Sequence, residues 1–166
     1  MRVHFIRHAI AVPRGAPGVV DDASRELTRE GIAKMRQQAR GLAKLKIDLA
    51  RIWTSPYARA RQTADILADE FGITGSVRVL PALAPGGSFD AILEELAANA
   101  SLNEAALVGH EPDLSTTIAR LLTGMTRSIL QLKKGGTACV RIDDFASPCR
   151  GDLCWLLTPR QLRSLG

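Results

Sequence analysis

Two of the three histidines and two arginines follow short apolar segments of this 166-residue sequence. Arg7 and His8 come directly after the first apolar segment, Arg59 comes shortly after another, and His110 follows a third. Guanidinium groups bind phosphate oxygens through paired hydrogen bonds, and an imidazole can act as a nucleophile or carry a proton. If folding brings these four side chains to one edge of a sheet, they form an anion-binding site.

Each of these residues also has an ordinary structural interpretation. A lone histidine at a strand end is most often a surface or hydrogen-bonded residue. Arg7 could be a charge at the mouth of a strand, and Arg59 a solvated helix residue. Convergence of all four on one edge is what favours the anion site.

A metal site is a second possibility, because His4 lies on the same face of its strand as His8. His4, His8 and His110 could ligate zinc together with Glu111 or Asp113. However, His4 lies about 13 Å along the strand from His8 at the usual rise per residue. We therefore expect no metal here and a partly buried, structural His4.

The segments that carry these residues alternate between apolar runs and amphipathic stretches. Strands are predicted at 3–6, 49–54, 77–80, 105–108, 138–142 and 153–157. The last two are expected to form an antiparallel pair near a sheet edge, joined by a loop that contains Pro148. Helices are predicted after Thr28, from near Tyr57 to Gly72, around 92–96 and after Pro112. This pattern predicts an α/β fold, a three-layer α/β/α sandwich with a mostly parallel central sheet. Ligands bind beyond the carboxyl ends of such strands, which is where the four residues fall.

Length and composition exclude several classes of protein. The length suits a single domain over residues 1–166, and no apolar run approaches the ~20 residues of a membrane span. The N-terminal segment is interrupted by charges, so we expect no signal peptide and a cytoplasmic protein without a membrane partner. The net charge of +5 suits anionic partners, but aromatic residues are only 4% of the chain, so we expect no nucleic-acid partner. The three cysteines show no Cys-x-x-Cys spacing and are interpreted as reduced thiols.

Four blocks of the chain, in the same order, resemble the motifs of the histidine phosphatase (phosphoglycerate mutase-like) superfamily. The blocks are Ile6-Arg7-His8-Ala9, the segment from Arg25 to Gly31, the segment from Ser55 to Thr63, and Val108-Gly109-His110-Glu111-Pro112-Asp113. The short length and the Gly-His-Glu-Pro block are most similar to the SixA-type phosphohistidine phosphatases. The resemblance implies a phosphoglycerate mutase-like fold.

The resemblance also implies a role for each residue of the predicted site. His8 would be a nucleophile that is transiently phosphorylated, while Arg7, Arg59 and His110 would bind the phosphoryl oxygens and stabilise the transition state. No cofactor and no metal are needed, because these cationic groups supply the positive charge. The substrate would be phosphohistidine in a protein partner; the alternatives are a small phosphorylated molecule and, in another class, a non-catalytic phosphate-binding adaptor.

The sequence departs from the family pattern at two places. Ala9 replaces the usual glycine after the nucleophile, which we expect to be tolerated if its backbone angle is ordinary. Many members carry a glutamate after the third strand that protonates a departing alcohol, whereas residues 80–87 contain no acid. Its absence favours phosphohistidine over alcohol phosphates, because an imidazole leaves more easily. The alternative is a general acid from another loop, for which the candidates are Asp21, Asp22, Asp90 and Glu111.

Overall fold

A mixed six-stranded sheet forms the middle of the molecule in the computed structural model, which describes residues 1–146 and 149–166. The strands are β1 (Arg2–Arg7), β2 (Arg51–Thr54), β3 (Val77–Val79), β4 (Glu104–Gly109), β5 (Thr137–Asp144) and β6 (Arg150–Leu157). Their order is β3-β2-β4-β1-β5-β6. The first four run parallel, whereas β5 is antiparallel to both β1 and β6. The predicted antiparallel pair at the edge is confirmed; its loop with Pro148 falls outside the described residues.

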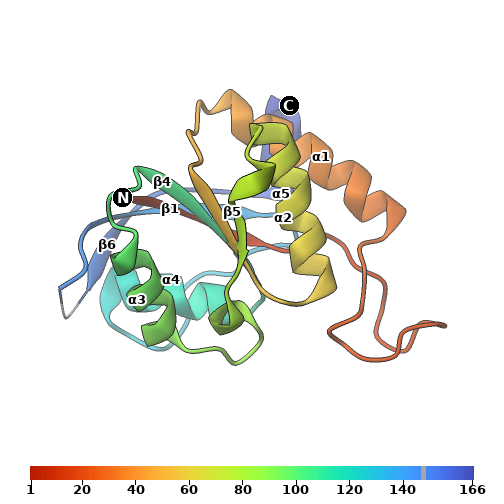
Figure 1. Cartoon of the computed structure of the whole chain (residues 1–166), viewed down its shortest axis with the longest axis horizontal. Helices are drawn as coiled ribbons and strands as arrows, with labels where there is room; N and C mark the ends of the chain where they lie inside the picture. The colour runs from red at the N-terminus through yellow and green to blue at the C-terminus, as the bar shows by residue number, and fades with distance from the viewer. Residues whose placement is uncertain (147–148) are drawn as a thin grey trace.

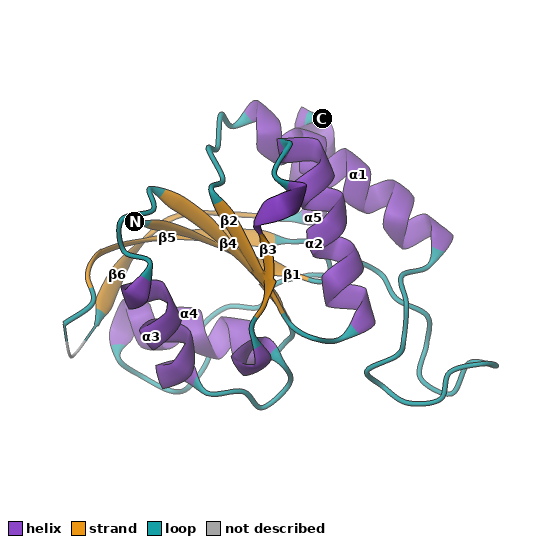
Figure 2. Cartoon of the chain, in the orientation of Figure 1, coloured by secondary structure: helices purple, strands orange, loops and turns teal. Residues whose placement is uncertain are grey.

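Helices cover both faces of the sheet (Figures 1 and 2). One face is covered by α1 (Arg29–Lys44), α2 (Ala58–Phe71) and α5 (Pro159–Leu165), and the other by α3 (Phe89–Ala98) and α4 (Asp113–Thr123). Two short 3-10 helices, Thr74–Ser76 and Pro81–Leu83, flank β3. Each interface has its own apolar core, with Met35 and Leu67 in one and Ile92 and Ile118 in the other. The predicted three-layer sandwich is therefore confirmed.

Local signals account for most of the helix ends. The Thr28 side chain accepts a hydrogen bond from the Gly31 amide at the start of α1, and Gly72 ends α2 with a φ of 68°. Pro112, expected in the first turn of α4, is its N-cap residue, and the helix begins at Asp113. The sequence interpretation missed α5, although Thr158 and Gln161 form a capping box at its start.

The remaining expectations concern single residues and membrane spans. His4 is buried in β1, its Nε2 atom lies 3.2 Å from a carboxylate oxygen of Glu104, and its ring packs near Trp155. His4 is a structural residue of the sheet as expected, but it is fully rather than partly buried. Ala9 has no left-handed backbone angle, so its methyl group is tolerated as expected. Among the described residues, no helix combines the length and apolar character needed to cross a bilayer.

Candidate active site

Three strands end together at one edge of the sheet. Two of them are followed by a histidine of the predicted site and the third by Ser55. Arg7 of β1 pairs with Gly109 of β4, so the residues that follow them, His8 and His110, leave the sheet side by side. The His8 amide donates a hydrogen bond to the Gly109 carbonyl over 3.1 Å, and the two imidazole centroids are 5.1 Å apart. Ser55, which follows β2, reaches the same edge, where its Oγ atom lies 2.8 Å from Nε2 of His110. Folding thus brings the two predicted histidines together.

His8 is a buried, neutral imidazole with a fixed orientation. Its Nδ1 lies 2.7 Å from the Ala9 carbonyl, which can only accept, so Nδ1 carries the proton and Nε2 keeps its lone pair. Arg59 donates its Nε–H to that lone pair over 3.2 Å. Burial, together with the charges of His110, Arg59 and Arg7, lowers the pKa of His8 to about 3, although the bond to Ala9 opposes this shift. His8 is therefore uncharged at neutral pH.

His110 is held by the same arginine and by Ser55. Nη2 of Arg59 donates to Nδ1 of His110 over 3.3 Å, so Nε2 carries the proton and donates to Ser55. Burial and the charge of Arg59 lower the pKa of His110 to about 4, against an opposing contribution from Asp22. His8 and His110 are only 6% and 3% exposed, although both lie at the end of the strands.

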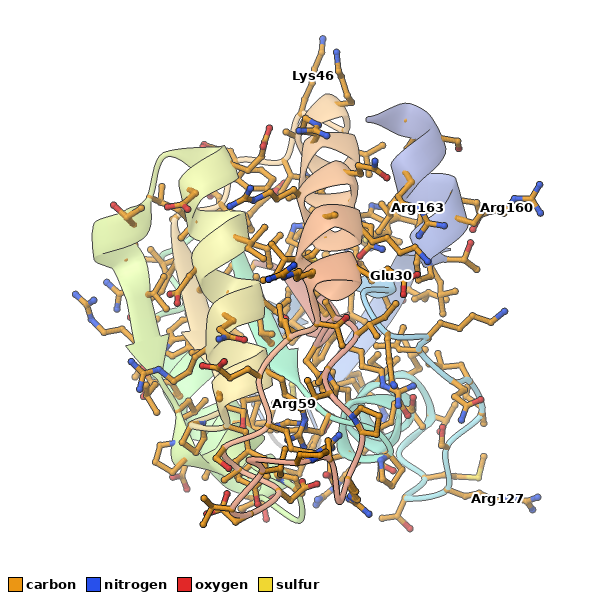
Figure 3. The ribbon with its side chains drawn as sticks, turned by 90° about the vertical axis from the view of Figure 1, so that its right-hand side faces the viewer. Glu30, Lys46, Arg59, Arg127, Arg160 and Arg163 are labelled. Atoms are coloured by element: carbon orange, nitrogen blue, oxygen red, sulfur yellow. The ribbon has the colours of Figure 1, made fainter. Side chains whose placement is uncertain are left out.

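Arg59 lies in the first turn of α2 and points to the sheet edge, behind the long segment that follows β1 (Figure 3). It is only 3% exposed, which rules out the interpretation of Arg59 as a solvated helix residue. Besides the two imidazoles, its guanidinium contacts Asp22, whose carboxylate accepts from Nη2 over 2.9 Å and whose carbonyl accepts from Nη1. Arg14 and Arg25 donate to the other carboxylate oxygen. Asp22 therefore neutralises part of a concentrated positive charge.

Arg7 is half-buried and less constrained than Arg59. Its Nη1 donates to the Leu132 carbonyl over 2.8 Å, while its Nε is buried with no hydrogen-bond partner in the described chain. Burial lowers the pKa of Arg7 and the charge of Glu111 raises it. An unpaired buried donor is costly, and a guanidinium remains charged in proteins, so this N–H is suited to an anion.

The carboxylates of the four candidate general acids make different contacts. The carboxylate of Asp21 accepts from the Ser24 amide, that of Asp90 lies 3.4 Å from Arg120, and that of Glu111 accepts from Ser115 and Leu132. Of these four carboxylates in the described chain, only that of Asp22 forms a hydrogen bond with one of the four predicted site residues. Burial raises the pKa of Asp22, but hydrogen bonds from Arg14 and Arg59 and nearby arginine charges outweigh it and lower the pKa to about 2. Asp22 is therefore ionised and unsuited to donate a proton at neutral pH.

Supporting residues connect the motifs, and sequence reasoning left their roles open. The Thr63 hydroxyl accepts from the Ala9 amide over 3.0 Å and donates to the Arg59 carbonyl over 2.7 Å, which ties α2 to the segment after His8. The Gln62 side chain accepts from the Leu27 amide and anchors the end of the long segment. In this structure Ser55, Gln62 and Thr63 thus orient the site.

The metal alternative would require several ligand side chains arranged around one point. Within the described chain, no group of three or more histidine, cysteine, aspartate or glutamate side chains is arranged to hold an ion. The residues that do converge, two imidazoles and two guanidinium groups, suit an oxyanion instead.

Known proteins with similar sequences and folds point to one family. Residues 3–84 match the family model described as "Histidine phosphatase superfamily (branch 1)". An uncharacterized protein of Picosynechococcus is 39% identical over 147 residues, 85% of each chain. The phosphohistidine phosphatase SixA of Escherichia coli is 28% identical over 165 residues, which cover 98% of this chain and 97% of SixA. The chain belongs to the histidine phosphatase superfamily.

The structural comparison agrees with this assignment. A structure of the protein histidine phosphatase SixA complexed with tungstate superposes with a TM-score of 0.85 and 27% identity, covering 98% of this chain and 99% of that one. The predicted phosphoglycerate mutase-like fold is therefore confirmed. The homology also identifies the chain as a phosphatase.

Proposed function

We propose that this phosphatase hydrolyses phosphohistidine in a partner protein, without a metal, through a phosphohistidine intermediate on His8. The observation that carries this proposal is the convergence of a neutral, oriented imidazole with one buried and one half-buried guanidinium group. The half-buried group, that of Arg7, has a buried N–H without a hydrogen-bond partner in the described chain. The similarity to SixA over nearly the whole chain supports phosphohistidine as the substrate.

His8 has the protonation and orientation that a nucleophile needs. Its Nδ1–H is anchored on the Ala9 carbonyl, so the lone pair lies on Nε2. An incoming phosphoryl group would accept the Arg59 Nε–H that now contacts this lone pair. Nε2 then attacks phosphorus, forming a P–N bond to His8 as the P–N bond to the substrate imidazole breaks.

The second step returns the enzyme to its starting state. Water attacks the phosphorus of the intermediate, the P–Nε2 bond breaks, inorganic phosphate leaves and His8 becomes a neutral imidazole again. Arg7 and Arg59 would hold the phosphoryl oxygens in both steps, where fixed positive charge stabilises the transition state. A bound dianion raises the pKa of His110, so His110 can then add a charged hydrogen bond.

The leaving group favours phosphohistidine over an alcohol phosphate. An alkoxide needs a general acid, worth about 10²–10⁴-fold, whereas an imidazole protonated on its other nitrogen leaves without one. In the segment after β3, where many family members carry a glutamate, the Leu83 carbonyl lies beside Gly109 and the apolar Leu83 side chain is buried. Asp22 is ionised, so it does not replace the missing acid.

The decisive experiment compares substrates in the presence of a chelator. We expect turnover of a chemically phosphorylated histidine protein to exceed that of sugar phosphates. Faster ester hydrolysis would instead support a phosphatase of small phosphomonoesters, and loss of activity on chelation would contradict metal independence.

A trapping experiment tests the nucleophile. Wild-type protein mixed with ³²P-phosphohistidine protein should form an acid-labile, alkali-stable phosphoenzyme, and His8→Ala should not. Label that persists in His8→Ala would show that another residue is the nucleophile. Binding of phosphate by the wild type without any turnover would favour the adaptor function.

A further inference from the structure

Arg7 is held in place by a single backbone carbonyl. Its Nη1 donates to Leu132, and no other side-chain hydrogen bond of Arg7 is present in the described chain. The orientation of this guanidinium therefore depends on where the Leu132 peptide lies.

Leu132 lies in the irregular connection between α4 and β5, where no helix or strand ladder fixes its backbone. Its side chain is buried in the core beneath α3 and α4. Its amide donates to Oε1 of Glu111 over 3.1 Å, so the backbone of this one residue is held by Glu111 at its N–H and contacts Arg7 through its carbonyl.

Glu111 follows His110 and uses both carboxylate oxygens as acceptors. The Ser115 hydroxyl lies 2.6 Å from each of them, and the Leu132 amide contacts Oε1. Both neighbours donate, which matches the acceptor role of a carboxylate. The bond from the Leu132 amide to Glu111 restricts the backbone of Leu132, and thereby the direction of the carbonyl that accepts from Arg7.

We propose that Glu111 is a positioning residue for Arg7, acting through the backbone of Leu132. It touches neither the phosphoryl group nor the leaving group; it fixes the carbonyl that orients the guanidinium. This inference rests on the phosphoryl-binding role proposed for Arg7, and it removes Glu111 from the candidate general acids.

The test uses tungstate binding to the intact protein, measured by calorimetry, together with turnover. Glu111→Ala should weaken tungstate binding and lower kcat/KM by about 10- to 100-fold, the range expected when a hydrogen bond to a charged group is misplaced. Glu111→Gln, which keeps an acceptor for the Leu132 amide, should restore both to within about threefold of wild type. Glu94→Ala, which removes an exposed carboxylate on α3, is the control and should change little.

A double-mutant cycle shows whether the effect passes through Arg7. In an Arg7→Ala background, Glu111→Ala should cause less than about a twofold further loss of tungstate binding. A fully additive loss would overturn the proposal, because it would mean that Glu111 acts on the site or on the fold independently of Arg7. Thermal unfolding of each variant identifies any loss that comes from misfolding.

Leaving-group dependence separates positioning from proton donation. A general acid would make Glu111→Gln as damaging as Glu111→Ala, and both would impair alkyl phosphates far more than aryl phosphates. That pattern would also overturn the proposal. Because tungstate carries no leaving group and forms no phosphoenzyme, the coupling between Glu111 and Arg7 can hold even if the substrate or nucleophile proposed above is wrong.

Discussion

The two arginines of the site are supported in opposite ways. Arg59 projects from a regular helix and is already engaged by Asp22, His8 and His110. Arg7 projects from a strand end and donates to one carbonyl, and its buried Nε–H has no hydrogen-bond partner among the residues that the structure describes. One guanidinium is thus occupied by an internal carboxylate, while the other retains an unused donor.

Because the two arginines are supported differently, the carboxylates of Asp22 and Glu111 should affect the binding of an anion in different ways. Asp22 binds Arg59 directly, and its charge reaches His110. A phosphoryl dianion must therefore compete with it. Glu111 contacts the Leu132 amide instead of the Arg7 guanidinium, so it supports Arg7 without occupying its donors. One carboxylate should oppose anion binding and the other should assist it.

The largest expected effect comes from removing the arginines themselves. Arg59→Ala should lower kcat/KM by at least about 10³-fold, because several donors to the transition state are lost at once and His8 loses the donor to its Nε2. Arg7→Ala should lower kcat/KM by about 10²-fold. Steady-state kinetics measure the difference. Arg61→Ala, an exposed arginine on the same helix, is the control and should stay near wild type. Equal losses at Arg7 and Arg59 would show that their different supports do not matter.

A smaller effect of opposite sign is expected at Asp22. Asp22→Asn should strengthen tungstate binding about fivefold, or roughly 1 kcal/mol, because the internal competitor for Arg59 loses its charge. Asp21→Asn removes the same charge one residue away, where the carboxylate contacts Ser24, and should have little effect on calorimetric affinity. Weaker tungstate binding in Asp22→Asn would mean that Asp22 mainly holds Arg59 in place.

The residues at the strand ends were easier to predict from the sequence than the contacts that hold their side chains in place. Apolar runs that stop at polar residues, together with the common direction of parallel strands, were enough to bring His8, His110 and both arginines to one edge. Burial of Arg59 was not predictable, because it arises when a segment without periodicity returns to place Asp22 on the guanidinium. The Glu111–Leu132 contact joins two residues 21 positions apart through an irregular connection, so no local pattern reports it.

The missed helix α5 has a similar physical origin. It spans only seven residues, of which Leu162 alone is buried, so it shows no clear apolar stripe. Its short capping signal is weaker than the periodic patterns that revealed the longer helices. Elements defined by periodicity were therefore predicted, and those defined by a few specific contacts were not.

The smallest expected effect is a change in the pKa of His8 when either arginine is replaced. Both charges lower the pKa of His8, Arg59 more than Arg7, so each alanine variant should raise that pKa, and Arg59→Ala should raise it further. NMR titration of the His8 ring measures both shifts; a larger shift in Arg7→Ala would reverse the assigned order.

The same pKa has a consequence for stability. His8 titrates at about 3 in the folded chain and near 6.5 when unfolded, so between these values the unfolded chain binds more protons. Stability should therefore fall as the pH drops from about 6.5 towards 3 and should be insensitive to His8 above that window. The lowered pKa values of His110 and His4 act in the same direction. A His8→Gln variant, which lacks the titrating group, should show a shallower pH dependence of its free energy of unfolding, and an unchanged slope would mean that His8 is not held neutral by the fold.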